Sequence, residues 1–373
     1  MAELLELEES GVQERFFASG WTDGLPIVPP TPDRVLEMML GGGVTDPDEV
    51  VGSVPQRRAT VTTELAAINA VMAGCAPEYF PLVLGALAAM LDPAFNANTA
   101  CTSTGGAALC VIASGPMAEA VGMNSRHNAL GSGNRANATI GRSLRLVAIN
   151  VLGAKTGGMD GSSIGHPGKY SLCFAEEPPA EPWEPLRVAL GYELEDTTVT
   201  VLPTEGPRQV ANHLNEDPAG VLDTFAATMR DPATFITGKQ GQGTVVLGHE
   251  HRLAVIGRGW SRRDVQEYLY EKSRVTPEDL ARGGVLLETD TGKDMVPDAD
   301  GLLASMASPD DIYVVTAGGA GAGWSAYIPN WAPPLHAQAR GVTRRVREPG
   351  EDLPLCGPDG CEVDLSPIRE TSS

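Results

Sequence analysis

The stretch Gly243-Thr-Val-Val-Leu-Gly-His-Glu-His-Arg252 contains the pattern that predicts the fold class. Its first five residues are typical of a buried strand, a polar loop follows, and a helical pattern covers residues 261–272. The same order recurs at 199–202 before a helical pattern at 217–229, and a strand predicted at 312–316 precedes a glycine-rich loop. Strands that alternate with helices at this spacing predict an α/β fold with largely parallel strands.

The N-terminal half of the chain has a different pattern, in which helices dominate. Apolar residues at helical spacing predict helices over residues 64–73, 78–91 and 137–151, and a short apolar run predicts a strand over 107–113. The proline-rich segment 178–185 ends this half. We therefore expect a two-part α/β protein with an N-terminal helix and extended arm over 1–30, an α/β domain over 31–178, a second α/β domain of strand-loop-helix units over 186–350, and a tail over 351–373.

Charge and composition exclude several classes of protein. The 27 Lys and Arg against 48 Asp and Glu give a net charge of −21, which repels nucleic acid and anionic membrane surfaces. The longest apolar stretch, residues 80–91, is shorter than the roughly 18 residues that a membrane-spanning helix needs. The N-terminus is acidic where a signal peptide is basic, and six cysteines are too few for a disulfide scaffold. We expect a cytoplasmic protein that binds neither nucleic acid nor membranes.

The densest polar segment is Met123-Asn-Ser-Arg-His-Asn-Ala-Leu-Gly-Ser-Gly-Asn-Arg-Ala-Asn-Ala-Thr-Ile-Gly-Arg142. A Gly-Ser-Gly turn leads into a predicted helix, and unpaired N–H groups at such a helix start attract anions. The arginines would add positive charge, which is typical of a pocket for a carboxylate or phosphate. The alternative is that Asn, Ser and Gly only form a tight turn and a helix cap. The candidate substrate-binding residues are Asn124, Arg135, Asn137, Thr139 and Arg142.

A second glycine-rich loop, over residues 157–170, contains groups that can transfer protons. The alternative is a surface loop with solvated charges. Besides Asp160, the candidate catalytic residues in this loop are His166, Lys169 and Tyr170.

A third glycine-rich loop, over residues 317–325, follows the strand predicted at 312–316. Open α/β sheets bind ligands at the carboxyl ends of their strands, so this position favours a ligand contact. No lysine follows in the manner of a phosphate-binding loop, which argues against nucleotide hydrolysis. The candidate ligand contacts are Gly318, Gly319 and Ser325.

A histidine pair follows the strand predicted over residues 243–247. If the segment is extended, His249 and His251 face the same side and, with Glu250, could share a divalent transition metal such as zinc or iron. The alternative is that one histidine caps the following turn and the other is exposed. A divalent metal is the single cofactor candidate in the sequence.

Two cysteines are candidate catalytic thiols. Cys75 lies beside a predicted helix start, which would lower its pKa, and Cys101 lies in a Thr/Ser/Gly loop suited to a nucleophile. Cys110 lies in an apolar strand and is expected in the core. In the tail, Cys356 and Cys361 could form a redox pair or contribute to a metal site. The alternative is that the tail is a flexible segment in which these cysteines have no function.

Six segments of the chain together resemble a known family: Trp21-Thr-Asp-Gly-Leu-Pro-Ile-Val-Pro-Pro-Thr31, Ala70-Val-Met-Ala-Gly-Cys-Ala-Pro-Glu-Tyr-Phe-Pro81, Arg135-Ala-Asn-Ala-Thr-Ile-Gly-Arg-Ser-Leu-Arg145, Gly165-His-Pro-Gly-Lys-Tyr-Ser-Leu-Cys-Phe-Ala-Glu176, Gly259-Trp-Ser-Arg-Arg-Asp-Val265 and Ala317-Gly-Gly-Ala-Gly321. The resemblance is to the long bacterial proteins that accompany, or are fused to, a small domain named for its selenocysteine–glycine–serine–cysteine motif. It spans about residues 20–330 and implies a cytoplasmic enzyme with redox or reductive-cleavage chemistry and a thiol- or selenol-bearing partner. This chain has no Cys-Gly-Ser-Cys motif.

These patterns together predict an oligomeric enzyme that acts on a small anionic metabolite. Its pocket would form where the three glycine-rich polar segments converge, with Cys75 or Cys101 as nucleophile or redox thiol and His166 or His251 as the proton-transfer group. One alternative is a metal-dependent lyase or hydrolase that uses the histidine pair. Another is a non-catalytic subunit that positions a thiol or selenol partner.

Overall fold

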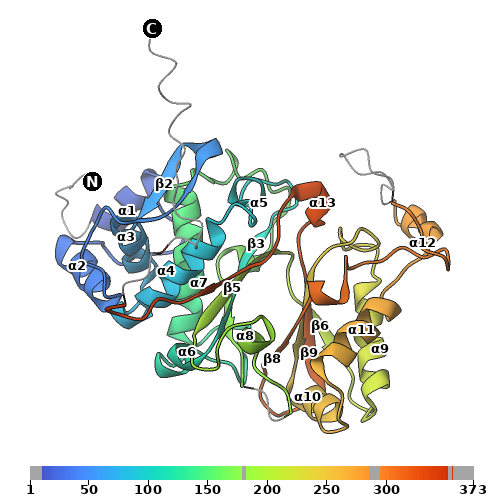
Figure 1. Cartoon of the computed structure of the whole chain (residues 1–373). Coiled ribbons are helices and arrows are strands. Elements are labelled where there is room, and N and C mark those ends of the chain that lie inside the picture. The colour runs from blue at the N-terminus through green and yellow to red at the C-terminus, as the bar shows by residue number, and fades with distance from the viewer. Residues whose placement is uncertain (1–10, 179–181, 285–294, 352–354, 356–373) are drawn as a thin grey trace.

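The computed structural model describes residues 11–178, 182–284, 295–351 and 355, and it confirms the predicted α/β class. Two four-stranded sheets form the centre, and helices cover the outer face of each (Figure 1). A short hairpin, β1 (Val50–Val54) with β2 (Ala59–Thr62), lies outside both sheets. No helix in the described part of the chain is long and apolar enough to cross a bilayer.

The first sheet has the strand order β10-β5-β3-β4. Strands β3 (Ala108–Ser114) and β4 (Leu172–Ala175) are parallel, while β5 (Thr198–Thr204) runs antiparallel to β3 and β10 (Val342–Arg345) antiparallel to β5. One side of this sheet is therefore formed by the amino ends of β3 and β4 and the carboxyl end of β5. We call this side, where the strands end, the amino edge. The carboxyl ends of β3 and β4 lie at the opposite, carboxyl edge.

Helices α4 (Phe80–Met90) and α7 (Arg135–Asn150) pack on the first sheet, and α3 (Thr63–Ala73) packs on α7 and α4. All eleven residues of α4 are buried, because the helix lies between the sheet and its neighbouring helices. The polypeptide before them forms α1 (Val12–Ala18), the extended arm and α2 (Pro32–Gly41). Short segments complete this half: α5 (Ala97–Ala100), α6 (Pro116–Ala120), α8 (Leu186–Ala189), α13 (Pro334–Ala337), and the 3-10 turns η2 (Pro55–Arg57), η3 (Pro77–Tyr79) and η4 (Pro167–Lys169).

The second sheet has the order β6-β9-β7-β8. Strands β7 (Gly243–Leu247) and β8 (Ile312–Thr316) confirm the predicted bounds and are parallel, and β9 (Trp324–Pro329) pairs antiparallel with β7 and with β6 (Arg208–Ala211). The prediction of largely parallel strands is therefore wrong. A parallel connection needs a dozen or more residues, and the loop between β8 and β9 is shorter than that. The outer helices and turn are α9 (Pro218–Met229), α10 (His249–Ile256), α11 (Arg262–Lys272), α12 (Pro277–Arg282) and η5 (Pro309–Asp311).

Side chains alternate along the central strands and so build a four-layer helix–sheet–sheet–helix structure. On β3, Leu109 and Val111 join the core beneath the helices, whereas Cys110 and Ile112 join a core shared with the second sheet. Val246 of β7 faces the same shared core. The two sheets thus pack face to face, as a period of two residues requires.

The predicted division at residues 178–186 does not follow the sheets. Both β5 and β10 come after it in the sequence, yet both belong to the first sheet with β3 and β4. The chain enters the second sheet after β5 and returns to the first sheet for β10.

Candidate functional site

A cluster of chemically active side chains lies at the amino edge of the first sheet. Asp160 Oδ2 lies 2.7 Å from a guanidinium nitrogen of Arg145, and its two oxygens lie 3.0 and 2.9 Å from the ammonium nitrogen of Lys169. The hydroxyl of Ser162 contacts both the Asp160 carboxylate and the Lys169 ammonium, each at 2.5 Å. We call Arg145, Asp160, Ser162 and Lys169 the Asp160 cluster.

Three elements bring the cluster together. Arg145 lies on α7, Lys169 ends the turn η4 just before β4, and Asp160 and Ser162 lie in the glycine-rich loop between them. The Ser163 amide donates a 2.9 Å hydrogen bond to the Thr104 carbonyl, which ties this loop to the segment that enters β3. The glycine-rich loop is therefore fixed against the sheet.

The cluster carries one more positive charge than negative charge. Burial opposes ionisation of Asp160, but hydrogen bonds from Ser162, Lys169 and Arg145 outweigh it and hold the pKa of this carboxyl well below its ordinary value. One carboxylate thus faces two cations, in a chain whose net charge is −21. The bond to Asp160 is the only side-chain hydrogen bond of Arg145 to the described residues, so the guanidinium keeps unused donors.

Two predicted catalytic residues belong to the surroundings of this cluster. Cys101 is close enough for Arg145 and Lys169 to lower the pKa of its thiol, but burial dominates and raises that pKa to about 11. Burial lowers the pKa of His166, and its Nε2 atom is buried without a hydrogen-bond partner among the described residues. Tyr170 is half exposed at the surface.

Cys75 and three predicted substrate-binding residues meet at a different place, the turn that follows α3. Arg135, Thr139 and Arg142 are spaced along one stripe of α7, and Thr139 hydrogen-bonds the Cys75 thiol. The lowered pKa predicted for Cys75 is wrong, because burial raises it to about 12. The adjoining η3 is a single turn whose dipole is too small to offset that burial.

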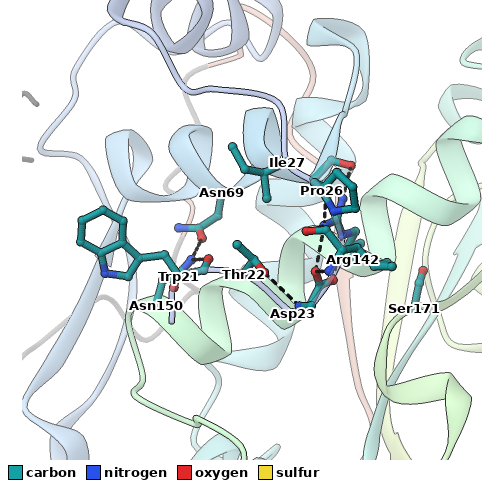
Figure 2. Close-up of polar contacts among 12 residues, drawn as sticks. Trp21, Thr22, Asp23, Pro26, Ile27, Asn69, Arg142, Asn150 and Ser171 are labelled. Atoms are coloured by element: carbon teal, nitrogen blue, oxygen red, sulfur yellow. Dashed lines mark hydrogen bonds and ion pairs between the residues drawn. The ribbon is translucent and has the colours of Figure 1, made fainter. Parts of the chain in front are cut away.

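Both of these arginines bind protein groups in the structure. Arg142 holds the Asp23 carboxylate through two 2.8 Å hydrogen bonds and also donates to the Pro26 carbonyl, so it anchors the extended arm to α7 (Figure 2). Arg135 donates to the main-chain carbonyls of Gly74 and Cys75. Their predicted role in substrate binding stays a prediction.

The polar segment after Met123 is organised by one buried side chain. Asn137 accepts from the Asn124 amide at 2.9 Å and donates to the Asn124 carbonyl at 2.8 Å, while Asn134 caps α7. This segment also contacts the third glycine-rich loop, where the Gly318 amide donates to the Ser125 carbonyl at 2.9 Å. Two of the three glycine-rich segments therefore meet at the carboxyl edge, whereas the loop over 157–170 lies at the amino edge.

The predicted metal site does not form. Residues from His249 onward are helical rather than extended, so the two histidines point in different directions. His251 is buried against Ser325 at 2.6 Å, His249 contacts Arg252, and Glu250 accepts from the Gly321 amide at 2.8 Å. No group of three or more His, Cys, Asp or Glu side chains within the described ranges is arranged to hold a metal.

Ser325 and His251 instead form a buried pair. The Ser325 hydroxyl also accepts from the Gly248 amide at 2.8 Å, and His251 Nε2 lies 2.8 Å from the Asn212 carbonyl. Gly319 packs against the ring of His127. Cys356 and Cys361 lie outside the described residues.

Sequence reasoning missed Arg145 and Ser162. Arg145 lies on α7 three residues after Arg142. This spacing alone does not predict that the Arg145 side chain contacts Asp160 in the loop over residues 157–170. Ser162 follows Asp160 closely within the loop of proton-transfer groups, and that proximity was the available signal. Comparisons of the chain with family models, with curated proteins and with solved structures find no match.

Proposed function

We propose that this protein is an enzyme that acts on a small anionic metabolite, with the Asp160 cluster as its catalytic centre. The observation that carries the proposal is the unbalanced charge: Lys169 and Arg145 share one carboxylate. A structural ion pair needs one cation per carboxylate, and an additional cation with free donors suits an anionic ligand.

The cluster suits a reaction in which negative charge develops on a substrate oxygen. The Arg145 guanidinium and the Lys169 ammonium would together bind the substrate carboxylate, and Lys169 would also stabilise the charge that develops on the reacting oxygen. The Ser162 hydroxyl, held between an ammonium and a carboxylate, would donate or accept a proton at the reacting atom. Asp160 would stay ionised and position the other three groups.

Thiol chemistry is a less favoured version of the same proposal. The four cysteines of the described segments are free and buried, and burial raises the pKa of Cys101 to about 11. A thiol with this pKa is almost entirely protonated at neutral pH, whereas the nucleophile is the thiolate.

Binding of carboxylates tests the proposal directly. We would titrate the full chain with a panel of small mono-, di- and tricarboxylates by isothermal calorimetry, and repeat the series with Lys169→Met and with Lys155→Met. Lys155 is an exposed lysine of the neighbouring segment. At least one carboxylate should bind to the wild type and to Lys155→Met, and about tenfold more weakly to Lys169→Met. Equal binding to all three proteins, or no binding to the wild type, would refute the proposal.

A further inference from the structure

A cavity of about 410 Å³ lies at the carboxyl edge of the first sheet, opposite the Asp160 cluster. It forms where β3 and β4 end, between the start of α6, the segment 123–126 and the segment 175–178. Its volume is in the range of small-molecule sites, and crevices beyond the carboxyl ends of strands are where α/β sheets bind ligands.

Among the charged side chains that line this cavity, Arg187 is held by hydrogen bonds to the Ser114 hydroxyl and the Leu194 carbonyl, whereas two of opposite charge, Glu119 and Arg126, are left largely unpaired. Glu119 is exposed and makes no hydrogen bond or ion pair through its side chain with the described residues. The Arg126 side chain is 74% exposed, and its one ion pair with a described residue, to Glu177, is long at 3.5 Å. Glu177 already has a closer partner, since Arg252 contacts its carboxylate at 2.8 Å.

The frame that holds these charges is rigid. The Asn124 side chain accepts from the Arg126 amide at 2.9 Å and donates to the His127 carbonyl at 2.8 Å. In the cavity wall, the buried Glu176 carboxylate accepts from the Ser114 hydroxyl and from the Leu186 amide. A ligand would therefore order only exposed side chains, which keeps the entropic cost of binding small.

We propose that this cavity binds a small zwitterion of the α-amino acid class. The ligand ammonium would pair with the Glu119 carboxylate, and the ligand carboxylate would form a bidentate contact with the Arg126 guanidinium. A ligand of one sign would leave one wall charge unpaired, so the pair of charges selects for a molecule that carries both. This site is separate from the Asp160 cluster and does not depend on the function proposed for it.

Calorimetric titration of the full chain with each of the common amino acids tests this site. For the best binder, the matched amine without the carboxylate and the matched acid without the amine are titrated as well. Each should bind about tenfold or more weakly than the amino acid. Glu119→Gln and Arg126→Ala should weaken amino-acid binding by a similar factor. Arg258→Ala removes an exposed arginine whose nearest carboxylate is 4.0 Å away, and it should leave binding unchanged.

The outcomes separate the two proposals. Amino-acid binding that neither Glu119→Gln nor Arg126→Ala weakens would overturn this inference, as would an amine or acid that binds as tightly as the amino acid. No binding of any amino acid at millimolar concentration would also overturn it. None of these results affects the carboxylate titration of Lys169→Met.

Discussion

The ammonium nitrogen of Lys169 lies 3.0 and 2.9 Å from the two carboxylate oxygens of Asp160, with side-chain exposures of only 13% and 3%. Arg145 contacts the same carboxylate. Because Asp160→Asn would leave these two cations together with little water around them, we expect it to lower the free energy of unfolding by about 3 kcal/mol. Urea denaturation measures this change.

The matched control is Asp310→Asn. Asp310 pairs with Arg263 at 2.6 Å, but its side chain is 80% exposed, so solvent screens the pair and its loss should change stability little. Equal losses in the two variants would mean that burial does not strengthen the Asp160 cluster.

Gly323 lies just before β9, where main-chain atoms approach closely. A Cβ atom added there would lie 1.9 Å from the Asn212 carbonyl oxygen and 3.0 Å from His251 Nε2. We expect Gly323→Ala to destabilise the protein by about 2 kcal/mol, because the backbone of β6 or β9 must shift. Gly321→Ala in the same loop meets no atom within 4 Å, and its melting temperature should match the wild type.

The buried His251 predicts a loss of stability in mild acid. Burial lowers its pKa, and a hydrogen bond to the Asn212 carbonyl only partly offsets this effect. The unfolded chain then takes up a proton below its ordinary pKa of about 6.5 more readily than the folded chain. The free energy of unfolding should therefore fall as the pH drops from 7.5 to 5.5.

Comparison with His251→Gln isolates this contribution. The variant should be less stable at pH 7.5 but should show a shallower pH dependence, whereas His127→Gln, which changes an exposed histidine that does not act on His251, should keep the wild-type dependence. An unchanged slope in His251→Gln would show that other groups cause the acid sensitivity.

The sequence predicts well those parts of the fold that depend on short runs of residues. Strands β7 and β8 are apolar runs that end in polar or glycine-rich loops, so their bounds follow from burial alone. Strand pairing depends on loop lengths and on packing between distant segments, and the antiparallel β9 was not predicted for that reason.

The same limit applies to the candidate site. Asp160 and Lys169 are in one loop, and their sequence proximity indicated a cluster of proton-transfer groups. Arg145 comes from α7, and only the packing of this helix against β4 brings it to the same carboxylate. The pKa of Cys75 was predicted in the wrong direction because burial, which sequence proximity does not reveal, outweighs the nearby positive charges.

Arg142 and Asp23 form the bidentate contact that joins the extended arm to α7, with side-chain exposures of 13% and 3% (Figure 2). We expect Arg142→Gln to increase amide hydrogen exchange over residues 21–28, because the substitution removes the contacts to Asp23 and to the Pro26 carbonyl. Arg135→Gln is the control, since Arg135 contacts Gly74 and Cys75 rather than the arm. The buried Ile27 and its two hydrogen bonds to Gln13 provide a second anchor. If Arg142→Gln leaves the exchange of the arm unchanged, the contact between Arg142 and Asp23 does not limit opening of the arm, and the remaining hydrogen bonds to Gln13, to the Met72 carbonyl and from Asn150 are sufficient to hold it.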